Sequence, residues 1–131
     1  MASEEYTYAF EKLDVWQLAR ILNKDIYDVT SLFPVDEKFG LITQLRRVSI
    51  SISSNIAEGS TRFHKNDQCR FYQIAFGSAI EVLSQCILAN DLNLLDNEKL
   101  VNIRIMINQI TFKLGGLIRS LDYKSKIYPK P

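Results

Sequence analysis

The side chains best suited to chemistry in this sequence are one histidine, His64, and two cysteines, Cys69 and Cys86. Metal sites in helical proteins commonly use paired histidines or closely spaced cysteines, and neither pattern is present. A Glu-x-x-His pair on a helix and a glycine-rich phosphate-binding loop are also missing. We therefore expect no catalytic residue, no metal and no cofactor. We interpret His64 as an exposed loop residue and the two cysteines as small core residues.

Cysteine spacing and the N-terminal sequence bear on the compartment. Cys69 and Cys86 lie on one predicted helix, about 25 Å apart along its axis, which is too far for a disulfide. The N-terminus MASEEYTYAF is acidic and has no apolar leader, and no apolar run approaches the ~18 residues that span a bilayer. We expect a cytoplasmic protein that does not contact membranes. The 131 residues and net charge of +1 indicate one domain without an overall bias toward nucleic acid.

The stretch RRVSISISSNIAEG, residues 46–59, contains an alternation of apolar and polar residues that is typical of a half-buried strand. With a helical period, the same stretch belongs to a longer apolar stripe, formed by Leu41, Leu45, Val48, Ile52 and Ile56. This stripe begins before the alternating residues and continues after them. Gly59 is also typical of the position just past a helix C-terminus. The pattern therefore predicts a helix rather than a strand.

Apolar residues spaced three and four apart predict three further helices. The three prolines, at positions 34, 129 and 131, leave residues 35–128 uninterrupted. We predict helices at roughly 12–33, 37–58, 67–92 and 97–122, with flexible tails at 1–9 and 124–131. Asp96 is placed to cap the last helix. Short turns between four helices favour an all-α, up-down-up-down antiparallel four-helix bundle.

Two of the predicted helices, 37–58 and 67–92, carry a second apolar side. A helix that is apolar nearly all round is buried on both sides, and an exposed apolar patch invites aggregation. We therefore predict a homo-oligomer built through these helices; the alternative for helix 37–58 is a core helix with surplus apolar residues. The predicted interface residues are Phe39, Ile50, Ala57, Cys69, Phe76, Ile80, Leu83 and Ile87.

An up-down order places the turn at 59–67 and the C-terminal residues at one end of the bundle, and both are rich in basic residues. Phe63, Tyr123 and Tyr128 are available there to stack on bases. The predicted nucleic-acid-binding residues are Arg62, His64, Lys65, Arg70, Arg119, Lys124 and Lys126. In the alternative interpretation, the basic residues near the C-terminus of the last helix only favour its dipole, and the tail is a solvated, disordered end. Acidic N-terminal residues at the same end reduce the positive potential.

Polar residues within the predicted helices have a structural interpretation. Arg47 and Glu81 could pair across neighbouring antiparallel helices at similar height. Such a partly buried network would set the register of the helices rather than catalyse a reaction.

Three strings, FEKLDVWQLA, FGLITQLRRVSISISSNIAEG and FYQIAFGSAIEVLSQ, carry a resemblance that spans roughly residues 10–121. In this order they resemble the bacterial family of four-helix-bundle proteins encoded by intervening sequences within 23S ribosomal RNA genes. That family also includes the accessory variability proteins of diversity-generating retroelements. The family motif falls on Gln44, Arg46, Asn55, Glu58, Gly59, Gly77, Ser78 and Glu81, with expected roles in helix packing, capping and subunit contact.

The resemblance implies a ring-shaped pentamer of up-down bundles with no known catalytic activity. It also implies partners, because the retroelement accessory members bind nucleic acid and a reverse transcriptase. Our first hypothesis is a non-enzymatic, cytoplasmic homo-oligomer whose basic end contacts RNA, DNA or another protein. The second is a protein-interaction scaffold without nucleic-acid binding, and the third is an enzyme with an unrecognised site.

Overall fold

The computed structural model describes the backbone of residues 5–125 and the side chains of residues 5–121. This part of the chain contains four α-helices and no β-strand, which confirms the predicted all-α, four-helix fold. Short 3-10 turns occur at η1 (Ala9–Lys12) and η2 (Val35–Glu37), and a π turn at η3 (Lys38–Ile42). The α-helices are α1 (Asp14–Thr30), α2 (Thr43–Ser60), α3 (Lys65–Asp91) and α4 (Asn97–Ser125).

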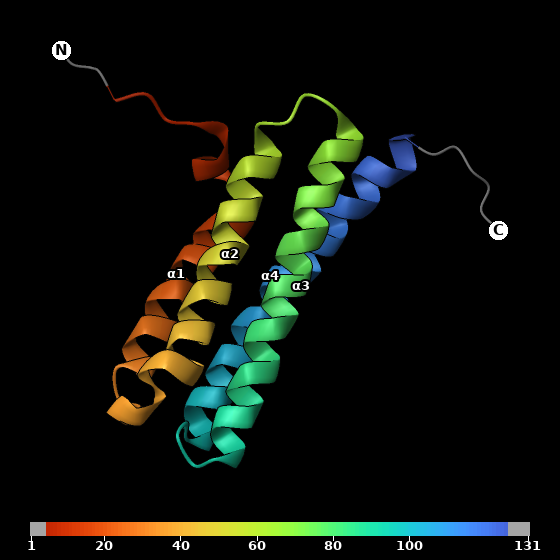
Figure 1. Cartoon of the computed structure of the whole chain (residues 1–131). Helices are drawn as coiled ribbons and strands as arrows, with labels where there is room; N and C mark the ends of the chain where they lie inside the picture. The colour runs from red at the N-terminus through yellow and green to blue at the C-terminus, as the bar shows by residue number, and fades with distance from the viewer. Residues whose placement is uncertain (1–4, 126–131) are drawn as a thin grey trace.

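The four helices lie side by side (Figure 1). Helices that follow one another in the chain pack together, and α1 also packs on α4. The segment 61–64 lies at the upper end in Figure 1, near η1 and the last turns of α4. The segments 31–42 and 92–96 lie at the opposite end. We refer to these as the 61–64 end and the 92–96 end.

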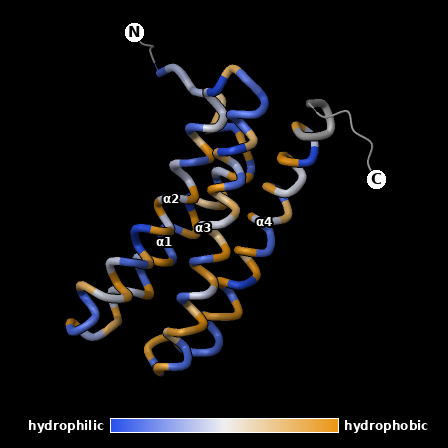
Figure 2. The backbone as a smooth tube through the Cα atoms, turned by 45° about the vertical axis from the view of Figure 1, so that its right-hand side comes forward, coloured by the Kyte–Doolittle hydropathy of each residue, from blue (hydrophilic) through white to orange (hydrophobic). Residues whose placement is uncertain are grey.

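The ambiguous stretch in residues 46–59 is helical, as predicted. Val48 and Ile52 are buried in the core, whereas Ile50, between them, is 42% exposed. Ser49 is also buried, and its hydroxyl donates to Asn23 Oδ1 on α1 at 3.1 Å. Hydrophobic and hydrophilic residues alternate along each helix in Figure 2. The largest fully buried core side chains include Leu22, Ile26, Ile52, Ile56, Val82, Ile107 and Leu114.

The start of the second helix differs from the prediction of residue 37. Residues 35–42 form the two short turns η2 and η3, and regular α2 begins only at Thr43. Gly40 departs from helical geometry, with φ −113° and ψ −113°. The Glu37 carboxylate accepts from the Leu41 N–H at 3.3 Å and occupies the place of a regular helical acceptor. The apolar spacing carried no sign of this local change in helix type.

The other helix boundaries shift by smaller amounts. The first helix ends at Thr30 rather than residue 33, because Pro34 disfavours helical geometry just before it. The last helix reaches Ser125, so it enters the predicted tail at 124–131. Residues 1–4 and 126–131, which make up most of the remaining predicted tails, lie outside the described residues.

The turn between α3 and α4 follows the rules of helix termination. Asn93 adopts a left-handed conformation, φ 62°, and Leu94 N–H bonds back to Ala89 O at 2.9 Å. The predicted cap of α4 is confirmed, since Asp96 Oδ1 accepts from the Lys99 N–H at 2.8 Å. This backbone hydrogen bond, with the Lys99 side chain, lowers the pKa of Asp96 from its ordinary value.

Polar contacts between α2 and α3 differ from the expected Arg47–Glu81 pair. The hydroxyls of Ser51 and Ser78 lie 2.9 Å apart and join the two helices. No ion pair connects Arg47 with Glu81 among the described side chains; Glu81 instead accepts from Gln85 at 3.4 Å. Small serines allow a direct contact here. Arg47, one turn before Ser51 on α2, is exposed and lines a pocket with Lys38.

The helix α3 is the one described helix that is long and apolar enough to cross a bilayer by length and composition. Such a feature is weak evidence for a membrane span, because a core helix of a bundle passes the same criteria. Ala75, Ala79, Val82 and Cys86 of α3 are fully buried in the bundle core.

Candidate functional site

Arg62 holds the turn at the 61–64 end together. Its guanidinium lies over the Phe71 ring, 4.5 Å from the centroid, and Nη2 is 3.4 Å from Glu58 Oε2. Its backbone carbonyl accepts from Gln68 Nε2 at 3.1 Å. These contacts make Arg62 a structural residue of the turn, with part of its charge neutralised by Glu58. The sequence pattern alone did not reveal this pairing.

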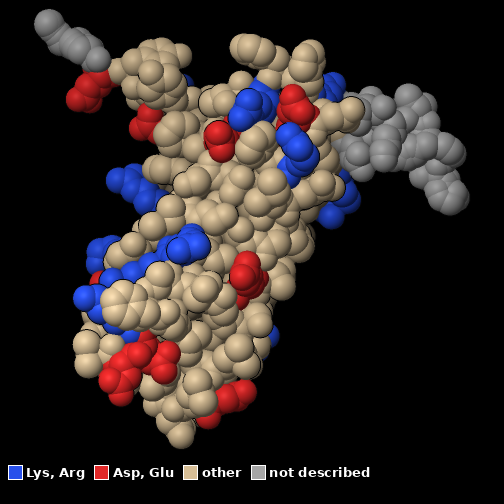
Figure 3. All heavy atoms as spheres, in the orientation of Figure 1, with Lys and Arg blue, Asp and Glu red and all other residues tan. Residues whose placement is uncertain are grey.

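The other predicted nucleic-acid-binding residues at this end are more accessible. His64, Lys65, Arg70 and Arg119 are exposed, and Phe63 is 98% exposed. Lys and Arg atoms lie directly beside Asp and Glu atoms at the upper end in Figure 3, so this surface is of mixed charge. The side chains of Tyr123 and Lys124 are not described, and Lys126 and Tyr128 lie outside the described residues.

The predicted interface residues occupy different environments. Phe39 is 89% exposed and Ile80 is 47% exposed, whereas Cys69 is buried. Phe76 and Leu83 are partly buried and pack against the core. Ala57 and Ile87 are partly buried. The apolar surface that remains accessible is therefore smaller than the predicted set.

The accessible members of this set fall into two groups, one on η3 and α2 and the other on α3. We name Phe39 of η3 with Ile50 and Ala57 of α2 the α2 patch, and Ile80 with Ile87 the α3 patch. Ile50 borders Tyr27 of α1, so the α2 patch lies toward α1. Ile80 is about 200° around α3 from Ser78, which contacts α2, so the α3 patch faces away from α2.

The members of the family motif lie in different surroundings. Asn55 Nδ2 donates to Ser51 O and Oγ, and Ser51 in turn contacts Ser78. Gly59 is buried, and a Cβ there would lie 2.8 Å from the Tyr72 ring. Arg46 contacts α1. The exposed members are Gln44, Glu58, Gly77 and Glu81.

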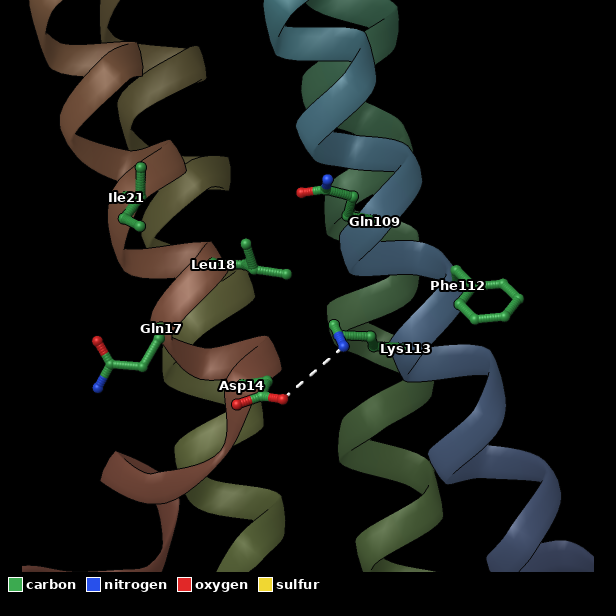
Figure 4. A pocket seen from close by; sticks show the side chains of 7 residues that line it. All are labelled: Asp14, Gln17, Leu18, Ile21, Gln109, Phe112 and Lys113. Atoms are coloured by element: carbon green, nitrogen blue, oxygen red, sulfur yellow. Dashed lines mark ion pairs between the residues drawn. The ribbon is translucent and has the colours of Figure 1, made fainter.

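A groove of about 580 Å³ between α1 and α4 was not predicted. Leu18 and Gln109 project into it, and Asp14 and Lys113 approach across it with 3.9 Å between Oδ2 and Nζ (Figure 4). Phe112, 77% exposed, lies at its edge. The signal in the sequence that could have predicted this groove is the presence of apolar residues outside the main apolar stripe of a helix, such as Phe112.

The next feature is the arrangement of the titratable side chains in the described residues. No three His, Cys, Asp or Glu side chains among them gather closely enough to hold a metal ion. Burial raises the pKa of Cys86 to about 12, so this thiol stays protonated at neutral pH.

Comparison with known proteins identifies the family. A family model described as 23S rRNA-intervening sequence protein matches residues 11–116, a range that extends from η1 into α4. No curated protein matches the chain. The matched range covers most of the 131 residues and contains every motif position named above. The predicted resemblance is confirmed, and the chain belongs to the 23S rRNA-intervening sequence protein family.

Proposed function

We propose that this protein is a non-enzymatic, cytoplasmic homo-oligomer in which up-down-up-down bundles join head to tail in a ring. The observation that carries the proposal is the pair of accessible apolar patches on different sides of one chain. A head-to-tail interface needs two different surfaces per subunit, and such an interface generates a ring when the rotation between subunits closes. A two-fold dimer would need only one self-complementary patch. The ring size of five follows from the family resemblance.

Solution mass measured by light scattering tests the ring. We expect wild-type protein near five chains, and monomers for both Ile50→Asp and Ile80→Asp, because each places a charge in one patch. Each variant keeps the other patch intact, so an equimolar mixture should form heterodimers. Phe112→Asp, on α4, is the matched control and should keep the wild-type mass. An unchanged mass for Ile80→Asp, or a monomeric wild type, would contradict the proposal.

We propose in addition that the 61–64 end contacts RNA or DNA. The fully exposed Phe63, followed by the exposed His64 and Lys65, favours this second role, since an aromatic ring beside cations can stack on an unpaired base. Protein partners such as a reverse transcriptase, expected from the family resemblance, would be recruited by the same assembly.

Binding of a single-stranded RNA, measured by fluorescence anisotropy over a range of salt, tests this contact. Phosphate contacts release counterions, so affinity should fall steeply as salt rises. Phe63→Ala and the double variant Lys65→Ala/Arg70→Ala should weaken binding without changing the oligomer mass. Arg62 is left intact because it stabilises the turn. If wild-type protein binds no RNA at low salt, the scaffold without nucleic-acid binding is the better description.

A further inference from the structure

A pocket of about 470 Å³ lies where α1, η3 and the first turns of α2 meet. Thr43, Arg46, Arg47 and Ile50 line it from one face of α2, at the spacing of adjacent helical turns. Lys38 of η3 and Tyr27 of α1 complete the wall. The volume is within the range of small-molecule sites. The pocket is remote from the 61–64 end.

The pocket brings three cations together without a carboxylate in its lining. None of Arg46, Arg47 and Lys38 forms an ion pair with a described Asp or Glu side chain. Of the acids nearest in sequence, Asp28 pairs with Lys24 at 3.3 Å and Glu37 accepts from Leu41 N–H, whereas Asp36 is exposed and does not line the pocket. Figure 3 shows Lys and Arg atoms gathered over the lower part of α1 and α2, with Asp and Glu atoms below them at the end of the chain's helices. Cations that line one pocket favour the binding of an anion there.

Arg46 is held in place by contacts with α1. Its Nε donates to Thr30 Oγ1 at 2.9 Å, and the Thr30 hydroxyl donates onward to Ile26 O at 2.7 Å. The guanidinium lies 4.4 Å from the centroid of the Tyr27 ring, and Nη2 is 3.4 Å from Tyr27 O. Among the described contacts, no hydrogen bond is formed by the remaining nitrogen, Nη1. A fixed, planar guanidinium loses little conformational entropy when it binds an oxyanion.

We propose that this pocket binds a phosphate group. Three cations match the multiple negative charges of a phosphate monoester or a pyrophosphate better than the single charge of a carboxylate. Ile42 and Ile50 supply an apolar border that suits the organic part of a phosphate ester. The inference does not depend on RNA binding at the 61–64 end, because none of the residues is shared.

The test is a calorimetric titration with inorganic pyrophosphate, ATP and a short single-stranded RNA. Lys38→Ala/Arg47→Ala removes two pocket cations that make no hydrogen bond among the described contacts, so folding should be retained. The charge-matched control is Lys65→Ala/Arg70→Ala at the 61–64 end. We expect wild type and control to bind pyrophosphate equally and the pocket variant at least tenfold more weakly. Amide NMR shifts should concentrate in residues 38–50 and at Tyr27.

Two comparisons make the outcome decisive. Arg46→Lys keeps the charge but loses the planar group on Tyr27, and it should weaken binding while circular dichroism stays helical. Ile50 also belongs to the α2 patch, so each titration is repeated in the Ile80→Asp background. The pocket can then be judged whether or not the ring forms.

The three probes distinguish the source of the phosphate. Pyrophosphate or ATP binding that the pocket variant loses identifies a small phosphate ligand. RNA binding alone, with the same loss, identifies the nucleic-acid backbone. Equal binding by wild type, pocket variant and control would overturn the proposal, as would a wild type that binds none of the three probes.

Discussion

Gly59 and Gly77 both lie inside helices, but their surroundings are opposite. A Cβ at Gly59 would lie 2.8 Å from Tyr72 Cε1 and 3.0 Å from Phe71 Cβ, so α2 and α3 approach closely there. At Gly77, nothing described lies within 4 Å of such a Cβ. We expect Gly59→Ala to destabilise the chain by about 1–3 kcal/mol through overpacking. Urea unfolding of the variant and wild type measures this.

Gly77→Ala is the matched control for Gly59→Ala. Without a clash, the better helix propensity of alanine should raise stability by up to about 1 kcal/mol. If Gly59→Ala leaves the free energy of unfolding unchanged, α2 and α3 do not approach each other closely at Gly59. Weakened assembly in Gly77→Ala would instead place a neighbouring subunit against this exposed position.

The cap residue Asp96 predicts a dependence of stability on acid pH. Its folded pKa is lowered chiefly because the carboxylate accepts the Lys99 backbone N–H, and secondly through the Lys99 side chain. A lowered folded pKa stabilises the protein above the ordinary value of 3.8, and this contribution is lost as pH falls through the folded pKa. Urea unfolding between about pH 6 and pH 2.5 should therefore show a shallower acid loss for Asp96→Asn than for wild type. Asp36→Asn removes one exposed carboxylate as a control, and equal slopes for all three proteins would contradict the prediction.

At the scale of the element, α2 shows why a serine-rich alternating stretch can be a helix. Its buried residues recur every three to four positions, and Ser49 and Ser51 reach α1 and α3 directly. A strand would bury Ile50 and Ile52 on the same face. In the helix, Ile52 is fully buried and Ile50 is 42% exposed.

This difference predicts unequal effects of the same substitution two residues apart. Ile52→Ala should cost about 2–5 kcal/mol of unfolding free energy because it leaves a cavity. Ile50→Ala should change it by no more than about 0.5 kcal/mol. Both are measured by urea unfolding in the Ile80→Asp background, which removes any contribution from association. Equal losses would refute the helical assignment of this stretch.

At the scale of the whole molecule, α1 is held less extensively than the other helices. The α2–α3 and α3–α4 contacts run along more of the chain than the contacts of α1 with α2 or α4. The groove beside Leu18 reflects this incomplete packing between α1 and α4. Arg46 compensates locally through its contacts with Tyr27 and Thr30.

We therefore expect α1 to open before the rest of the bundle. In native-state hydrogen exchange, amides of α1 should exchange faster than buried amides of α3, because local opening needs less free energy where fewer contacts are broken. Arg46→Ala should increase exchange in α1 while leaving α3 unchanged. Exchange of both helices at one common rate in all variants would indicate that the bundle opens only as a unit.

Local patterns account for the parts of the fold that the sequence predicted. Helix number and type follow from apolar spacing, which depends on the backbone period and on nothing distant in the chain. The Asp96 cap follows for the same reason, since its partner Lys99 is three residues away. The start of α2 was missed because Gly40 changes the helix type without disturbing the apolar pattern.

Contacts between distant residues required the tertiary structure. Arg47 was expected to meet Glu81, but it lines a pocket with Lys38, and Ser51, one turn further along α2, makes the contact with α3. The pairing of Arg62 with Phe71 and Glu58 likewise depends on how the turn folds back. The basic residues at the 61–64 end were predictable from the sequence, but the partial neutralisation of the Arg62 charge by Glu58 was not.

The sequence by itself determined an all-α chain of four helices, the faces that form its core, and its family. Only the tertiary structure decided which sides of neighbouring helices meet. It therefore decided that three cations share a pocket beside Tyr27 and that the apolar patches lie on different sides of the chain. The physical reason is one of range. A helix forms through bonds between residues four apart, whereas its rotation against a neighbour is set by the packing of side chains from the whole bundle.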